Sequence, residues 1–173
     1  MEELGTVKTA KKFDHLYPEE GEILVIAETM QSRDSLERRL GFDSIINSEF
    51  KKLSILPTLE TYNDPIRTKK VVTNALKNHK NIRGVYILSS EARIIMNAIS
   101  KIPQVDSLTK IAHERTAYTQ DALEKSELDA VITQNTGHLV RSAIRTLRAK
   151  SDSRDIVESQ EKIRIEILLK ENL

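Results

Sequence analysis

The chain of 173 residues has no cysteine, no tryptophan and only five glycines, and aromatic side chains make up 4% of it. Without cysteine, a disulfide framework, thiol chemistry and thiolate metal sites are all excluded. The 27 basic and 26 acidic residues leave a net charge of +1. A protein with so little net charge has no global field to hold nucleic acid or anionic lipid, so a basic nucleic-acid-binding module is disfavoured.

A long apolar run is missing from the first residues, 1–13, which mix acidic, basic and small side chains. This composition fits neither a signal peptide nor a membrane span. We therefore expect a cytoplasmic location and no membrane partner. The length suits one domain of ordinary size or two small lobes.

The sequence motifs of nucleotide and metal chemistry are also absent. There is no GxGxxG, no GxxxxGK[ST] and no GxSxG. The four histidines, His15, His79, His113 and His138, are far apart and form no HxH or HxxxH pair. We expect no metal, no cofactor and no catalytic residue.

Short apolar runs rich in β-branched residues predict six strands. They cover residues 22–27, 53–56, 84–88, 109–112, 129–133 and 162–169. Segments with apolar residues at three- and four-residue spacings lie between them and predict helices. These cover residues 5–16, 34–50, 65–79, 91–102, 119–125 and 138–150. Regular alternation of this kind predicts an α/β fold with a doubly wound parallel sheet and helices on both faces.

Two local features refine this prediction. Asp64 followed by Pro65 predicts a helix start, because proline fits the first turn and the aspartate can cap it. In the last predicted strand, Lys162, Arg164 and Glu166 alternate with isoleucines, which is typical of an edge strand. We expect the last 45 or so residues to join a different sheet.

Polar side chains follow four of the predicted strands, where open α/β sheets bind ligands. Guanidinium, amide and carboxylate groups suit a polyhydroxylated ligand, since each can pair with neighbouring hydroxyls. The candidate ligand-binding residues are Asp34, Arg38, Ser89, Glu91, Arg93, His113, Glu114, Gln134 and Asn135.

Simpler interpretations stay open for several of them. Asp34 can cap a helix, Arg38 can be solvated on a helix surface, and His113 can be an ordinary loop histidine. Gln134 is the exception, because an amide directly after an apolar strand is costly to bury without partners, at ~1–3 kcal/mol. With so few aromatics, any stacking on a ligand would come from Tyr86, from Tyr118 or from a missing lobe.

Three segments together resemble a known family: ERRLGF at 37–42, LDAVITQ at 128–134 and IRIEILLKENL at 163–173. They are similar to the sugar-binding module of type I periplasmic binding proteins, above all to the ligand-binding domain of lac-repressor (LacI) family regulators. The opening GTVKTAKKF, residues 5–13, resembles the helix that begins the second half of those modules.

The resemblance implies a division of the chain. Residues 1–128 correspond to the C-terminal lobe, residues 129–160 to a crossover strand and helix of the N-terminal lobe, and residues 161–173 to the returning strand. Most of the N-terminal lobe and the DNA-binding headpiece have no counterpart. Strands left without partners would favour association, so we expect residues 129–173 to dock against a second copy, giving a homodimer, or to rearrange.

The resemblance also implies roles for particular residues. Arg38 matches an arginine that contacts sugar hydroxyls, and Gln134 matches a glutamine that contacts ligand near the hinge. His113 or its neighbour Glu114 takes the place of an acidic residue. Residues 89–93, Ser-Ser-Glu-Ala-Arg, replace the family's turn containing Asn-Asp.

These observations give three hypotheses. The first is the effector-binding domain of a LacI-type regulator that binds a sugar or sugar derivative, catalyses nothing, and reaches operator DNA only through the absent headpiece. The second is a periplasmic sugar-binding protein that serves a transporter. The third is a flavodoxin-like α/β enzyme in which His113 and Glu114 act as acid and base.

Overall fold

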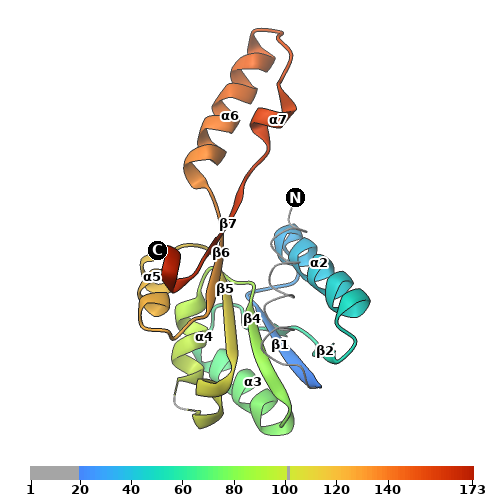
Figure 1. The fold of residues 1–173 in the computed structure, drawn as a ribbon, viewed down its shortest axis with the longest axis vertical. Coiled ribbons are helices and arrows are strands. Elements are labelled where there is room, and N and C mark those ends of the chain that lie inside the picture. The colour runs from blue at the N-terminus through green and yellow to red at the C-terminus, as the bar shows by residue number, and fades with distance from the viewer. Residues whose placement is uncertain (1–19, 101) are drawn as a thin grey trace.

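A computed structural model describes residues 20–100 and 102–173 (Figure 1). The helix expected at 5–16 lies outside these residues. Seven strands are present in the described residues: β1 (Gly21–Ala27), β2 (Leu53–Ile55), β3 (Leu59–Glu60), β4 (Ile82–Ile87), β5 (Thr109–His113), β6 (Ala130–Gln134) and β7 (Ile165–Leu168). The α-helices there are α2 (Arg33–Glu49), α3 (Pro65–Asn78), α4 (Ala92–Ile99), α5 (Ala117–Glu124), α6 (Thr136–Ser151) and α7 (Glu158–Glu161).

All six predicted strands are confirmed, as are the five predicted helices that fall on described residues. Helix α4 ends three residues earlier than predicted, and a 3-10 turn, η1 (Pro103–Ser107), follows it. Proline explains the early end, since it disfavours helical geometry in the residue before it. A second 3-10 turn, η2 (Lys170–Asn172), ends the chain.

The strands form one sheet in the order β2-β1-β4-β5-β6-β7, and β3 also pairs with β1. Every pair is parallel except β6 with β7, which is antiparallel. The expectation of a different sheet for the last 45 residues is therefore wrong. Strand β6 pairs with β5, and β7 folds back beside β6, with Gln134 opposite Ile165. The predicted edge position of β7 is confirmed.

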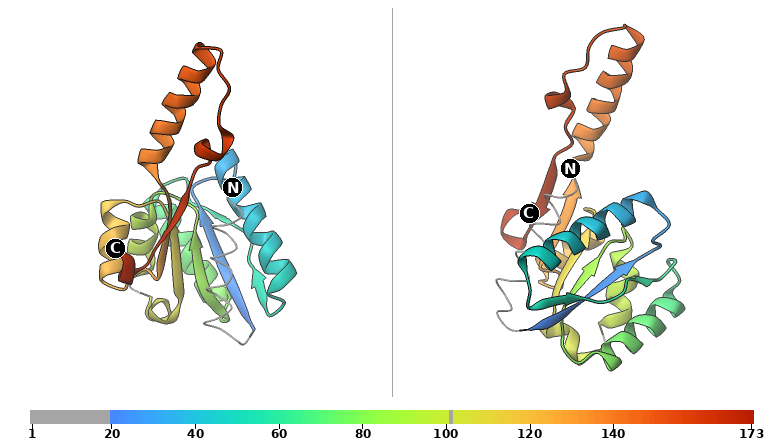
Figure 2. Two further views of the ribbon diagram at one scale, coloured as in Figure 1. Left: turned by 45° about the horizontal axis from the view of Figure 1, so that its top comes forward. Right: turned by 90° about the vertical axis from the view of Figure 1, so that its right-hand side faces the viewer.

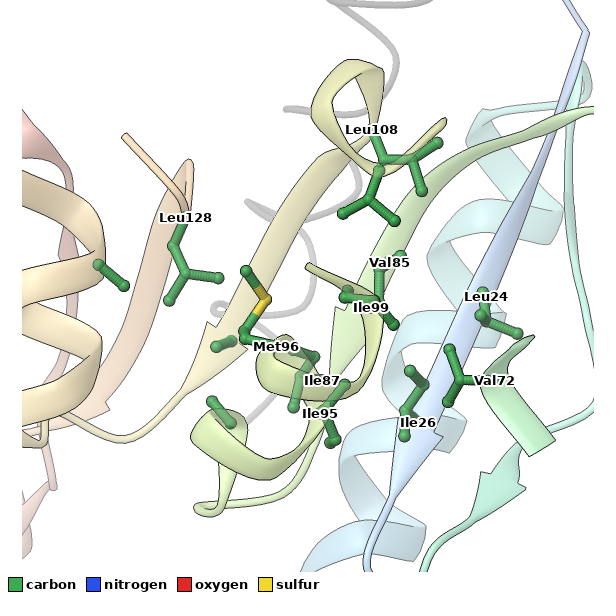
Figure 3. Packing of buried hydrophobic residues seen from close by; sticks show 14 of the residues in the cluster. Leu24, Ile26, Val72, Val85, Ile87, Ile95, Met96, Ile99, Leu108 and Leu128 are labelled. Carbon is green, nitrogen blue, oxygen red and sulfur yellow. The ribbon is translucent and has the colours of Figure 1, made fainter. Parts of the chain in front are cut away.

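Helices cover both faces of this sheet, which confirms the doubly wound α/β class (Figure 2). Alternate residues of β1 show the two faces: Leu24 and Ile26 pack with α3 and α4, whereas Ile23 and Val25 pack with α2. Figure 3 shows the first of these clusters around Ile95 and Ile99 of α4. Each fully buried aliphatic side chain of this kind contributes roughly 1.5–3 kcal/mol, so the two clusters fix the carboxyl ends of the strands in place.

Helix α2 carries the first site residue. Its buried stripe consists of Arg38, Phe42 and Ile46, spaced four residues apart along one face. The helix begins at a Ser32 cap, whose side chain accepts a hydrogen bond from the Ser35 amide at 3.1 Å. Phe42 and Ile46 hold the helix against the sheet, and this places Arg38, one turn nearer the N-terminus, over the carboxyl ends of the strands.

Helix α6 and the segment that returns from it form an arm that extends away from the sheet (Figure 1). Arg145 clamps the returning segment to α6, with its Nε and Nη2 atoms 2.7 and 2.8 Å from the two carboxylate oxygens of Glu161. Hydrogen bonds from Arg145 and Ser142 lower the pKa of Glu161 to about 2. Ser142 is the only buried residue of α6.

The opposite side of the arm is apolar and exposed. Val140, Ile144 and Leu147 follow one another at helical spacing and are 57, 60 and 68% exposed. A stripe of this kind is what a helix normally buries against a neighbour. Among the described residues, no helix has the length and apolar character needed to span a membrane.

Candidate functional site

A small pocket lies where β5 and β6 end, roofed by α2 and bordered by the start of β7. Its lining consists of Arg38, His113, Glu114, Ile132, Thr133, Gln134 and Ile165. The cavity measures about 20 Å³. That is room for roughly one water molecule, since a water needs about 10–15 Å³, and ligand pockets typically enclose about 300–1,000 Å³. The residues that line the pocket can therefore form only one wall of a site for a larger molecule.

Arg38 is the central side chain of this wall, and it is only 6% exposed. Its Nη1 donates to the Leu88 carbonyl at 3.1 Å, just beyond the end of β4. Its Nη2 lies 3.0 Å from Glu114 Oε1 and 2.8 Å from Asp34 Oδ2. The interpretation of Arg38 as a solvated surface arginine is therefore wrong, and so is that of Asp34 as the cap, which Ser32 provides.

Glu114 follows directly after β5 in a left-handed conformation, with φ of 69°. This conformation costs a non-glycine residue about 1–3 kcal/mol and persists only where its surroundings enforce it. Here the Glu114 amide donates to the Ile132 carbonyl at 2.8 Å, and its carbonyl accepts from Thr119 Oγ1 at 2.9 Å. These bonds fix the turn, and the Glu114 carboxylate beside Arg38 stays partly exposed.

His113 lies beneath this ion pair, at the end of β5. Its Nε2 is 2.6 Å from the Tyr86 hydroxyl, and both side chains are buried. Burial, and secondarily the Arg38 charge, lower the pKa of His113 well below its ordinary 6.5. His113 is therefore neutral at pH 7. The Tyr86 ring packs against Phe42, with ring centroids 4.6 Å apart, so the prediction that Tyr86 could stack on a ligand is wrong.

Gln134 is the last residue of β6, and its side chain is partly buried at the pocket. Within the described residues its side-chain amide makes no hydrogen bond, so both its donor and its acceptor are available. The neighbouring Thr133 also lines the pocket, and its Oγ1 accepts from the Arg115 amide at 3.2 Å.

The other candidates lie outside the pocket lining. Ser89 is buried, and its hydroxyl accepts from the Glu91 amide at 3.0 Å, at the start of α4. Arg93 is exposed in the first turn of that helix. Asn135 caps α6, accepting from the His138 amide and donating to Glu166, both at 2.8 Å. Its amide is thus occupied within the fold.

The structure thus brings four of the predicted residues together in the pocket lining, with Asp34 beside them. The four are Arg38, His113, Glu114 and Gln134. The lining residues that were missed are Ile132, Thr133 and Ile165. Thr133 was detectable, since it precedes Gln134 at the end of the same strand. Ile165 was not, because its place depends on β7 returning beside β6. In the part of the chain that the structure describes, no group of three or more metal-ligating side chains is assembled.

Comparison with known proteins gives a match to the family model described as periplasmic binding protein domain, over residues 5–155. No curated protein matches the chain in sequence. GanP, a glucose-galactose binding protein from Geobacillus stearothermophilus, matches in structure with 13% identity and a TM-score of 0.84, over 99% of this chain and 61% of its own.

Two further solved structures match similarly. The sugar-binding protein of a sugar ABC transporter from Bacillus halodurans has 16% identity and a TM-score of 0.82, over 99% of this chain and 62% of its own. An ABC transporter solute binding protein from Agrobacterium vitis, bound with α-D-tagatopyranose, has 17% identity and a TM-score of 0.84, over 98% and 57%. At these identities the likeness establishes the fold. This chain spans about three-fifths of the length of these structures.

These matches confirm the resemblance to type I periplasmic binding proteins and correct two expectations. The interpretation as the effector-binding domain of a LacI-type regulator is wrong, since the matching family model is periplasmic and the matched structures are named as sugar-binding proteins and transporter components. The expectation of a cytoplasmic location is wrong for the same reason. Nothing in these matches supports operator DNA or a homodimer as partner.

Proposed function

The chain belongs to the family of periplasmic binding protein domains, and on that premise we propose that it is part of a solute-binding protein that captures a sugar for a transporter. The observation that carries this proposal is the convergence of Arg38, Glu114 and Gln134 on one pocket at the carboxyl edge of the sheet. In this role the protein works outside the cytoplasm, and it binds and releases the sugar without changing it chemically.

The chemistry of the three side chains supports a sugar ligand. A sugar hydroxyl both donates and accepts hydrogen bonds. The Arg38 guanidinium donates, the Glu114 carboxylate accepts, and the Gln134 amide does both. Matched structures are named for glucose-galactose binding, for a complex with D-arabinose and for bound tagatopyranose, which favours the same ligand class.

An enzyme that uses His113 and Glu114 as acid and base is less well supported. The Nε2 atom of His113 is engaged by the Tyr86 hydroxyl, and the His113 ring is buried beneath the ion pair. The Glu114 carboxylate is paired with Arg38 at 3.0 Å. His113 is not placed to act beside Glu114 as an acid–base partner, so binding without catalysis is the better interpretation.

We further propose that this chain supplies one lobe of a two-lobed binding protein, with residues 1–128 in the C-terminal lobe, residues 129–160 crossing to the other lobe and residues 161–173 returning. Three observations support this division. The arm exposes an apolar stripe, the cavity is too small to enclose a sugar, and the chain spans three-fifths of its structural matches. The second lobe would cover the stripe and close over the pocket.

The position of the pocket connects ligand binding to lobe movement. The polypeptide enters the arm after Gln134 and returns from it before Ile165, and both residues line the pocket. The Asn135 amide donates to the Arg164 carbonyl at 3.2 Å and joins the two crossing segments. A sugar that contacts Gln134 therefore acts directly at the point about which the arm would turn.

Titration calorimetry with D-galactose, D-arabinose and D-tagatose tests this proposal. We expect weak but saturable binding of at least one of these sugars, because one wall of the site is present. Arg38→Ala should weaken that binding by about 1.5–3 kcal/mol, as loss of a charge-assisted hydrogen bond. Arg33→Ala, an exposed arginine on the same helix, is the matched control and should bind normally. Absence of binding to all three sugars, or an unchanged affinity in Arg38→Ala, would contradict the proposal.

A further inference from the structure

The charges of the pocket wall point to a selection among sugars. We propose that this site accepts neutral and amine-bearing sugars and discriminates against sugar acids and sugar phosphates, because two carboxylates flank the Arg38 guanidinium. This inference rests on the proposed function and adds the charge class of the ligand.

The positive charge of Arg38 is already committed to protein acceptors. Its Nη2 lies within 3.0 Å of carboxylate oxygens on both Asp34 and Glu114, and its Nη1 donates to the Leu88 carbonyl. A ligand carboxylate or phosphate would have to compete with Asp34 and Glu114 for the charge of Arg38. Weakening the partly buried ion pair between Arg38 and Glu114 in this way is costly, whereas a neutral hydroxyl that accepts from Arg38 leaves the pair intact.

The two carboxylates retain capacity to accept hydrogen bonds from a ligand. The Glu114 side chain is 31% exposed and that of Asp34 is 54% exposed. An ionised carboxylate offers about four acceptor positions, of which Arg38 occupies only a part. Hydroxyl and ammonium groups can fill the remainder, whereas an anion meets repulsion there.

Within residues 20–100 and 102–173, no second cation lines the pocket, because Arg38 is the only basic side chain of the lining there apart from neutral His113. Arg115 comes directly after Glu114, but its guanidinium donates to the Gln120 side chain on α5. Arg33 pairs with Glu37 on the exposed face of α2. Counted with Asp34, which lies beside the lining, Arg38 and its two carboxylate partners have a formal charge of −1.

The size of the expected discrimination follows from Coulomb's law. Like charges about 5 Å apart, at an effective dielectric constant of about 20, repel strongly enough to weaken binding more than tenfold. Neutral sugars escape this penalty, and an amine-bearing sugar gains the corresponding attraction.

The experiment compares D-galactose, D-galacturonate and D-galactosamine, which share one ring stereochemistry and differ in charge. Each is titrated into the ¹⁵N-labelled 173-residue chain, and the amide shifts of Glu114, Thr133 and Gln134 report binding at the pocket. We expect galactose and galactosamine to shift these amides, and galacturonate to bind at least about tenfold more weakly than galactose. Glu114→Gln should reduce this preference about tenfold, while Glu37→Gln, an exposed control on α2, should leave it unchanged.

The outcomes separate this inference from the proposed function. Galacturonate binding as tightly as galactose, or an unchanged preference in Glu114→Gln, overturns the inference and leaves sugar binding in place. Failure of all three sugars to shift the pocket amides overturns both. If Glu114→Gln loses its fold, Asp34→Asn removes the other carboxylate from a more exposed position and makes the same comparison.

Discussion

His113 gives the fold a specific dependence on pH. Its pKa in the folded protein lies well below the ordinary 6.5, first because it is buried and then because Arg38 is near. Between the folded pKa and 6.5 the unfolded chain binds a proton that the folded chain lacks, so the free energy of unfolding rises with pH in that interval. We expect stability to be independent of this group above pH 6.5 and to decrease as the pH falls below it.

Urea unfolding between pH 8 and pH 5.5 measures this effect. In His113→Gln the decrease below pH 6.5 should become smaller, whatever the variant's absolute stability. Identical slopes in wild type and His113→Gln would show that the buried imidazole does not limit stability in acid.

Lys110 is a buried cation with a structural function. Its Nζ donates to the carbonyls of Val105 and Leu108, each at 3.0 Å, and so ties the η1 turn to β5. Lys110→Met keeps the aliphatic volume but leaves both carbonyls without this donor, and we expect a loss of about 1–3 kcal/mol in the free energy of unfolding. Lys125→Met, at an exposed lysine, should have no measurable effect in the same urea experiment. Equal stability of the two variants would contradict this function.

Sequence alone identified Arg38, Glu114 and Gln134 because each follows an apolar strand or begins the helix after one. It could not choose between His113 and Glu114 as the side chain presented to a ligand. That choice depends on the left-handed backbone at Glu114, which a non-glycine residue rarely adopts and no local pattern indicates. The burial of Tyr86 between Phe42 and His113 was equally hidden, since it requires contacts across three elements.

At the scale of the elements, the start of α3 is a direct test of a sequence signal. Asp64 caps this helix as predicted, accepting from the Ile66 and Arg67 amides at 2.8 and 3.1 Å, and Pro65 takes the first helical position. Asp64→Ala should lower the free energy of unfolding by about 1 kcal/mol. Asp64→Asn, which keeps an oxygen acceptor, should lose much less. Chemical denaturation of both variants measures the two losses in the free energy of unfolding. Equal losses would indicate that the charge of Asp64, and not its capping hydrogen bonds, stabilises the helix.

Periodicity predicted the long elements well and the short ones poorly. Strand β3 has two residues and helix α7 four, too few to show any repeat. Periodicity also could not predict that β7 returns antiparallel to β6. A run such as KIRIEILL shows alternation and hence an edge, but the direction and partner of the strand depend on the arm that precedes it.

For the whole molecule, the sheet body and the arm differ in how well they bury their apolar surface. The body encloses two clusters, one on each face of the sheet. The arm is braced by Arg145 and Glu161 but leaves Val140, Ile144 and Leu147 exposed. A chain with such a stripe should bury it in any way available, by a second lobe in a two-lobed protein or by another copy when the chain is alone.

We therefore expect the isolated 173-residue chain to self-associate reversibly as its concentration rises. The double variant Ile144→Lys and Leu147→Lys should shift the chain toward monomer without lowering the stability of the body, since neither residue contributes to the two clusters. Ile66→Lys is the matched control, because Ile66 is 83% exposed and belongs to α3 rather than to the arm. Sedimentation equilibrium over a range of concentrations measures the change. A wild-type chain that stays monomeric at high concentration would show that the exposed stripe does not drive association.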